Sequence, residues 1–86
     1  MSEEDISNVL ECVFHEVFDD TAIAIHREMT AKEVGEWDSF NHVRLIVAVE
    51  DRFEISFSTT EVADLQNVGE LIDLISSHRS KRRSAG

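Results

Sequence analysis

Ser39 is the residue whose type and position could do chemistry, because it places a hydroxyl at the expected start of a helix. It follows Asp38 within residues 35–40, and an amphipathic segment begins directly on it. A side chain at a helix start is exposed and lies beside unpaired backbone N–H groups. Such a hydroxyl can act as a nucleophile, or it can hold a covalently attached group.

A catalytic serine needs a histidine base and an orienting acid close in space. His42 follows three residues after Ser39. A side chain one turn along a helix rarely reaches back to the first helical position, and no Gly-x-Ser-x-Gly elbow surrounds the serine. We therefore predict that the chain has no catalytic residue and is not an enzyme.

Metal and phosphate sites are not predicted either. The acidic residues form no calcium-binding loop, and the three glycines form no phosphate-binding loop. The histidines are scattered along the chain, with no shared ligand spacing: they are His15, His26, His42 and His78.

The charge of the chain is strongly acidic and unevenly distributed. Residues 1–78 contain all 18 acidic residues and four basic ones, a formal charge of −14, whereas residues 79–86 carry four basic residues. An acidic body repels nucleic acids and anionic membranes, and it favours encounter with basic protein surfaces. We expect a folded domain over residues 1–78, no nucleic-acid binding, and a basic, disordered tail over residues 79–86.

Length and composition indicate one small domain. The chain has 86 residues, of which 42% are hydrophobic, and a single cysteine, Cys12, which excludes an internal disulfide. The acidic start, residues 1–5, differs from a basic secretory signal, and the longest apolar run, residues 45–49, is too short to cross a bilayer. The sequence predicts a cytoplasmic monomer without membrane insertion.

The first of four predicted helices follows from a single apolar stripe that ends near Asp19. Ser2 and Asp5 are expected to form a capping box at its start. Cys12 and His15 point away from the stripe, so both are predicted to lie on the surface. The stripe consists of Ile6, Val9, Leu10, Val13, Phe14, Val17 and Phe18.

The stretch between Asp19 and Asp38 has no helical period and is predicted to be a long loop. Thr30 and Glu33 are expected to cap a short turn, and Gly35 to supply a sharp bend. A loop of this length is uncommon unless it is anchored. Spaced apolar residues indicate that it is pinned across the helices: Ile23, Ile25, Met29, Val34 and Trp37.

The second helix is predicted from Ser39 to Phe53, with Asp38 as its N-cap. Its apolar arc is broader than a core stripe requires. Either the helix is deeply buried, or part of the arc near Ser39 is left for something else to cover. The arc contains Phe40, Val43, Leu45, Ile46, Val47, Val49 and Phe53.

Two further helices complete the pattern. After an extended link over residues 55–57, Ser58 or Thr59 begins a brief helix that reaches Leu65. Asn67 caps the last helix, which ends near Ser77. The predicted fold is all-α: a four-helix bundle with one short helix and a long loop between the first two helices.

Asp38-Ser39-Phe40 lies between a long loop and an apolar-faced helix in a small acidic domain, and this arrangement resembles the acyl carrier proteins. The resemblance extends from about Glu4 to Ile75. In that family an Asp-Ser-Leu motif opens the second helix, and its serine carries 4'-phosphopantetheine through a phosphodiester. The resemblance implies an acyl carrier domain in which Ser39 holds this cofactor and Asp38 presents the hydroxyl to a phosphopantetheinyl transferase.

The resemblance also implies roles for the surroundings of Ser39. The thiol of the cofactor holds an acyl group as a thioester, and the apolar face of the second helix can shelter the acyl chain. The acyl-pocket candidates are Phe40, Val43, Val47, Ala63 and Leu65. The partner-recognition candidates are Trp37, Arg44, Glu50, Asp51 and Glu54.

The motif departs from the common family pattern. Phe40 replaces leucine, Arg44 stands where fatty-acid carriers tend to be acidic, and Trp37 is more typical of specialised stand-alone carriers. We expect a carrier that serves a specialised lipid or secondary-metabolite pathway. The biosynthesis of a fatty acid or of a polyketide would be such a pathway. A ligase, synthase or acyltransferase with a basic docking surface would load the carrier. Two alternatives stay open: a small acidic interaction domain without a prosthetic group, and an aminoacyl or peptidyl carrier.

Overall fold

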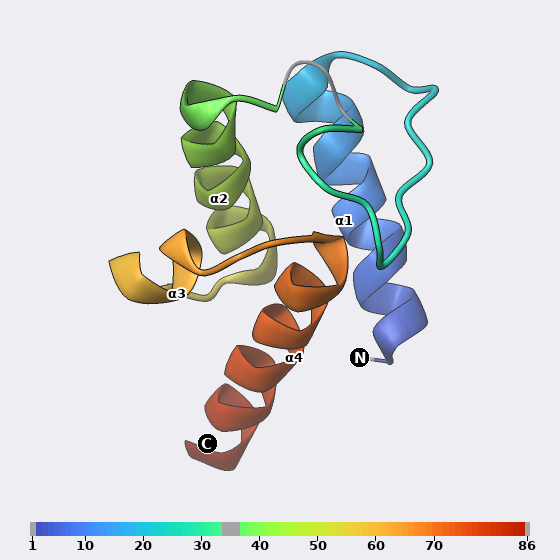
Figure 1. Cartoon of the computed structure of the whole chain (residues 1–86). Coiled ribbons are helices and arrows are strands. Elements are labelled where there is room, and N and C mark those ends of the chain that lie inside the picture. Colours follow the sequence, from blue (N-terminus) through green and yellow to red (C-terminus); the bar gives the residue numbers. More distant parts are fainter. Residues whose placement is uncertain (1, 34–36, 86) are drawn as a thin grey trace.

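The computed structural model describes residues 2–33 and 37–85, and Figure 1 shows their arrangement. Four helices are present in these residues, and no strand: α1 (Glu3–Phe18), α2 (Ser39–Phe53), α3 (Thr59–Ala63) and α4 (Val68–Ala85). The long helices α2 and α4 both pack against α1. The predicted all-α fold, with one short helix and a long loop between the first two helices, is confirmed.

The starts of α1 and α2 follow from their capping residues. Ser2 and Asp5 form the predicted capping box before α1, and Asp19 ends that helix in the left-handed conformation, with φ 51° and ψ 45°. Asp38 caps α2 by accepting the Asn41 N–H at 2.9 Å. A side-chain oxygen in this position satisfies one of the N–H groups that the first helical turn leaves unpaired.

Both α3 and α4 begin as predicted. Ser58 and Glu61 form a capping box at α3, which ends at Ala63, two residues before the predicted end at Leu65. Asn67 accepts the Glu70 N–H at 2.9 Å through its side chain and so caps α4.

The predicted end of the last helix near Ser77 is wrong, because α4 continues to Ala85. Residues 79–85 therefore belong to α4 in this structure. The apolar stripe stops at Ile75, but no glycine or proline follows until Gly86. Lysine and arginine are good helix formers and suit the negative end of the helix dipole. The division into a carrier domain over residues 1–78 and a separate tail stays a prediction.

The core lies where α1, α2 and α4 meet, and α3 contributes no buried residue to it. Burying a large apolar side chain contributes about 1.5–3 kcal/mol, so these helices supply the stability. The fully buried side chains are Ile6, Leu10, Val13, Phe14, Leu45, Val49, Phe53, Val68, Leu71 and Ile75.

Apolar residues pin the long loop to the helices, as predicted. Met29 is buried in the core, while Ile23 and Ile25 are half-buried and pack against it. Val34 and Gly35 lie outside the described residues, so the predicted anchor and bend there stay predictions. The loop lies alongside α1 and comes close to the start of α4 (Figure 1).

Hydrogen bonds fix the same loop to α4. The Val68 N–H donates to the Met29 carbonyl at 2.9 Å, and the Gly69 N–H donates to the Arg27 carbonyl at 2.8 Å. The Arg27 guanidinium also donates to the Asp73 carboxylate at 2.9 Å. This hydrogen bond to Asp73 raises the pKa of Arg27.

Polar residues of α1 hold the first part of the loop. Nε2 of His15 lies 2.7 Å from the Ile23 carbonyl oxygen, and Glu11 accepts the Ile25 N–H at 3.0 Å. His15 is half-buried, so the predicted surface position is wrong for this residue. Cys12 is exposed, as predicted.

Residues 2–33 and 37–85 contain four helices whose length, apolar character and side-chain placement are relevant to two other kinds of site, a membrane span and a metal centre. None of these helices has both the length and the apolar character needed to cross a membrane. No group of three or more His, Cys, Asp or Glu side chains in residues 2–33 and 37–85 is placed to hold a metal ion.

Candidate functional site

Ser39 is the first residue of α2, and its side chain is exposed. The capping residue Asp38 accepts the Asn41 N–H with its carboxylate and the His42 N–H with its carbonyl, at 2.9 and 2.8 Å. Within the part of the chain that the structure describes, no acceptor meets the N–H groups of Ser39 and Phe40. These groups lie at the positive end of the helix dipole, so an anion on Ser39 would find donors beside it.

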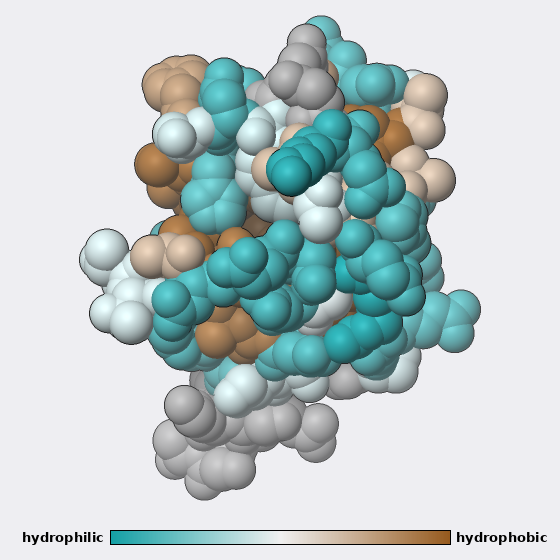
Figure 2. Space-filling model, in the orientation of Figure 1, coloured by the Kyte–Doolittle hydropathy of each residue, from teal (hydrophilic) through white to brown (hydrophobic). Residues whose placement is uncertain are grey.

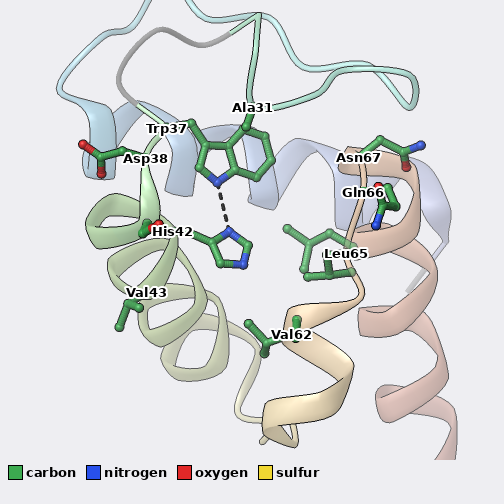
Figure 3. A pocket seen from close by; sticks show the side chains of 12 residues that line it. Ala31, Trp37, Asp38, His42, Val43, Val62, Leu65, Gln66 and Asn67 are labelled. Atoms are coloured by element: carbon green, nitrogen blue, oxygen red, sulfur yellow. Dashed lines mark hydrogen bonds between the residues drawn. The ribbon is translucent and has the colours of Figure 1, made fainter.

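A groove of about 630 Å³ opens beside Ser39, between α2 and the segment formed by α3 and the following link (Figure 3). Its lining is mostly apolar, with polar side chains at the rim. The lining residues are Ala31, Trp37, Asp38, Ser39, His42, Val43, Val62, Ala63, Leu65, Gln66, Asn67 and Leu71.

Trp37 and His42 form a hydrogen-bonded pair at this groove. Nε1 of Trp37 donates to Nδ1 of His42 at 3.0 Å, and the two rings are inclined by 20°. The indole also packs edge-on against Phe14, with centroids 5.4 Å apart. An indole N–H can only donate, so Nδ1 accepts and the proton of the neutral imidazole lies on Nε2.

Comparison with known proteins shows to which family a chain with this arrangement belongs. Residues 8–75 match the family model described as "Phosphopantetheine attachment site". A solution NMR structure of holo acyl carrier protein from Geobacter metallireducens is 35% identical, covers 92% of this chain and 91% of that one, and superposes with a TM-score of 0.86. The chain belongs to the acyl carrier protein family.

A curated relative supports the same assignment. The acyl carrier protein of Lactobacillus johnsonii is 29% identical over 80 residues, which cover 93% of this chain and the whole of that protein. Proteins of the acyl carrier family are carriers and not enzymes, and they bear covalent 4'-phosphopantetheine. The predictions of a carrier, of this cofactor and of this family are therefore confirmed.

The surroundings of Ser39 fit the cofactor. A phosphodiester needs an exposed hydroxyl, which Ser39 provides, and the two adjacent N–H groups can bind its negative charge. The groove begins at the same residue and offers an apolar surface along which an arm could lie.

Three of the five acyl-pocket candidates line this groove, namely Val43, Ala63 and Leu65. Phe40 and Val47 do not line it and are 71% and 58% exposed, so the structure places both outside the predicted pocket. Successive helical residues turn by about 100°, which sends the side chain after Ser39 to a different face.

The exposed apolar residues form a second surface on α2, which we call the α2 apolar face: Phe40, Val43 and Val47. Figure 2 shows hydrophobic surface, in brown, at the upper left, where α2 lies in Figure 1. A hollow of about 410 Å³ adjoins it toward α1, lined by Glu16, Val17, Val43, Arg44, Val47 and Ala48. The unassigned part of the predicted apolar arc therefore faces outward and is not core.

Three partner-recognition candidates lie on exposed surface: Arg44, Asp51 and Glu54. Arg44 donates to the Asn41 side chain at 3.2 Å, and its guanidinium carbon lies 6.0 Å from the centre of the Phe40 ring. This distance is within the range of a cation–π contact. A positive charge therefore borders the α2 apolar face.

Trp37, Glu50 and the exposed Glu54 also have structural roles in the fold. Trp37 is half-buried against the core, and Glu50 is half-buried and accepts the Phe57 N–H at 2.8 Å. Glu54 ends α2 in the left-handed conformation, with φ 56°. Their predicted role toward partners stays a prediction. Trp37 was expected to anchor the long loop, whereas the structural roles of Glu50 and Glu54 were not predicted.

The sequence also left several groove residues without an assigned role. The sequence predicted neither a catalytic nor a metal-binding role for His42, although its spacing from Ser39 places it on the same side of the helix. Nothing in the sequence indicates that the Trp37 indole turns back onto it. The other groove residues that were not predicted to lie at this site come from other elements: Ala31, Val62, Gln66, Asn67 and Leu71.

Proposed function

We propose that Ser39 carries 4'-phosphopantetheine through a phosphodiester, and that the thiol of this arm holds an acyl group as a thioester. One observation carries the proposal: the exposed serine hydroxyl lies at the first position of α2 and lines the groove, beside N–H groups of the first helical turn. The chain then presents its cargo to partner enzymes without performing chemistry itself.

The residues around Ser39 have separate tasks in this proposal. The N–H groups of Ser39 and Phe40, with the helix dipole, stabilise the phosphodiester by about 0.3–1 kcal/mol. The Asp38 carboxylate adds a negative charge nearby and opposes this effect, so its contribution is to cap α2 and fix the position of the hydroxyl. Activation of the hydroxyl falls to the transferase, since Nδ1 of His42 is already engaged by Trp37.

The groove gives the arm a place to rest. Val43 of α2 and Val62 and Leu65 on the opposite wall supply apolar contacts (Figure 3). Contact with this surface removes apolar area of the arm and its cargo from water, at about 25 cal/mol per Å². One side of the thioester would then be shielded from water until a partner withdraws it.

Partner enzymes would meet an acidic protein with the α2 apolar face exposed. We propose a phosphopantetheinyl transferase and an acyl-loading ligase, synthase or acyltransferase with a basic docking surface as partners. The departures at Phe40 and Arg44 support a specialised lipid or secondary-metabolite pathway. The strong negative charge and single cysteine support a cytoplasmic monomer.

Mass spectrometry after incubation with coenzyme A and a broad-specificity phosphopantetheinyl transferase tests the attachment site. Wild-type protein should gain one phosphopantetheine, and Ser39→Ala should gain none. Ser76→Ala, an exposed serine of α4, is the matched control and should be modified like wild type. The proposal fails if folded wild-type protein gains nothing or if Ser39→Ala is still modified.

A further inference from the structure

His42 is held in one orientation at the edge of the groove. Its Nδ1 accepts from the Trp37 indole at 3.0 Å, and the indole is itself fixed by edge-on packing against Phe14. The imidazole therefore has little freedom to turn, and in its neutral form the second nitrogen, Nε2, carries the proton. A donor N–H is thus kept at a defined place.

This donor faces the groove. In Figure 3 the nitrogen of His42 that does not meet Trp37 lies on the side of the ring toward Val62 and Leu65. No acceptor for Nε2 is present in residues 2–33 and 37–85, so none of these residues uses this hydrogen-bonding group.

The donor is also close to the attachment site. Side chains three residues apart on a helix are neighbours, with Cβ atoms about 5–6 Å apart. His42 stands in this relation to Ser39, and both residues line the same groove. An arm that leaves Ser39 and lies in the groove therefore passes the imidazole.

Other polar side chains at the rim have partners within the fold. The Asn67 side-chain oxygen caps α4 by accepting from Glu70, and the Gln66 amide donates to the Asp64 carbonyl at 3.4 Å. These contacts serve the link between α3 and α4. The oriented imidazole is better placed to bind something in the groove itself.

We propose that His42 donates a hydrogen bond from Nε2–H to a neutral oxygen acceptor on the arm attached to Ser39, and that Trp37 is the positioning residue for this donor. The inference rests on the proposed function, because the arm must be attached at Ser39. The acceptor has two sources with the same chemistry: an amide carbonyl or hydroxyl of the phosphopantetheine, or a carbonyl or hydroxyl of the acyl group.

Nitrogen-15 NMR of the imidazole rings tests this contact on the full chain. The apo protein, the holo protein, and protein loaded from butyryl- and 3-hydroxybutyryl-coenzyme A are compared. Exchange of the His42 Nε2 proton with water should slow by about two- to ten-fold in a form that makes the bond. Slowing in the holo form identifies an acceptor on the phosphopantetheine, and slowing only after acylation identifies the cargo. His26, in the long loop, is the internal control and should not change.

Two variants separate a hydrogen bond from simple packing. His42→Phe keeps a ring but removes the donor, so the NMR shifts of the arm should return toward those of the free cofactor. Trp37→Phe keeps an aromatic ring but removes the indole donor, so His42 should populate both tautomers and lose part of its protection. His42→Gln restores a donor and should recover part of the effect.

The result that overturns the inference is an exchange rate of the His42 proton that is equal in apo, holo and both acylated forms. Mass spectrometry of the same samples verifies loading, so a sample that fails to load refutes the attachment proposal instead. Thermal melts of the variants exclude loss of the fold as the reason for a missing signal.

Discussion

The Gly69 N–H lies 2.8 Å from the carbonyl oxygen of Arg27, and a Cβ atom placed on Gly69 would lie 3.0 Å from the same oxygen. The start of α4 thus touches the backbone of the long loop, and a Cβ atom at Gly69 would be crowded against Arg27. Together with the bond between Val68 and Met29, this contact sets the position of the loop that leads to Trp37 and Ser39.

Gly69→Ala should therefore destabilise the protein. Alanine ordinarily favours a helix over glycine by about 0.5–1 kcal/mol, but crowding against Arg27 should outweigh this and lower the free energy of unfolding by about 1–2 kcal/mol. Urea unfolding followed by circular dichroism measures the change. Ser76→Ala, at an exposed site of the same helix, should be neutral or slightly stabilising, and stabilisation by Gly69→Ala would contradict the close contact.

Asp38→Ala should lower the free energy of unfolding by about 1 kcal/mol, because α2 loses its N-cap. The transferase should also modify Ser39 more slowly, since the first turn that holds the hydroxyl frays. Asp38→Asn keeps a capping oxygen and should stay close to wild type in stability. Equal destabilisation by both substitutions would show that charge, and not capping, is the important property of this residue.

Local signals in the sequence were sufficient for the helix starts. Ser2, Asp38 and Asn67 cap their helices as predicted, because a cap depends on residues a few positions away. Ser58 caps α3, whose start was predicted at either Ser58 or Thr59. The end of α4 was not predictable from its apolar stripe, since the charged extension of the helix has no apolar face to bury against the core. Helix ends without a glycine or proline leave little trace in a sequence.

The position of Ser39 at the start of α2 was predictable from the sequence, but the groove beside it was not. Ser39 and Asp38 follow from a motif and a cap, both of which are local. The opposite wall is brought there by packing of α3 and the long loop, and so is the turn of the Trp37 indole onto His42. Periodicity placed Phe40 and Val47 on an apolar arc, but it could not say which part of the arc faces solvent.

The wall formed by α3 should depend on pH through Glu61. Its carboxylate accepts the Ser58 N–H at 2.9 Å and contacts His78 of α4 at 3.0 and 3.1 Å, and these bonds lower its pKa, with the backbone bond the largest cause. A group whose pKa is lower when folded stabilises the fold above its ordinary pKa. That stability is lost as the pH falls through the lowered value.

Glu61→Gln should therefore reduce the loss of stability on acidification below the ordinary pKa of glutamate, because the amide still accepts from Ser58 but does not titrate. Melting temperatures measured across this acidic range give the comparison. Glu4→Gln, at an exposed site of α1, removes one carboxylate without this contact and should keep the acid dependence of wild type. If the melting temperature of Glu61→Gln fell on acidification as much as that of wild type, the dependence of stability on the Glu61 pKa would be refuted.

Salt should stabilise the protein, because residues 1–78 carry a formal charge of −14 that repels itself. Raising sodium chloride from about 10 to 500 mM shortens the screening length severalfold, and a gain of about 1 kcal/mol would raise the melting temperature by about 4–8 °C. Asp51→Asn should raise the melting temperature at low salt, with a smaller gain at high salt. A melt that does not respond to salt would contradict the repulsion.

Substitution on the α2 apolar face should separate docking from stability. Val47 is 58% exposed and does not line the groove, so Val47→Ser should change the free energy of unfolding by only about 0.5 kcal/mol. If the transferase docks on this face, the loss of one apolar contact of about 1.4 kcal/mol should lower kcat/KM for modification of Ser39 about tenfold. Ala24→Ser, at an exposed position of the long loop, is the control and should be modified at the wild-type rate. Equal rates for Val47→Ser and wild type would place the docking surface elsewhere on the protein.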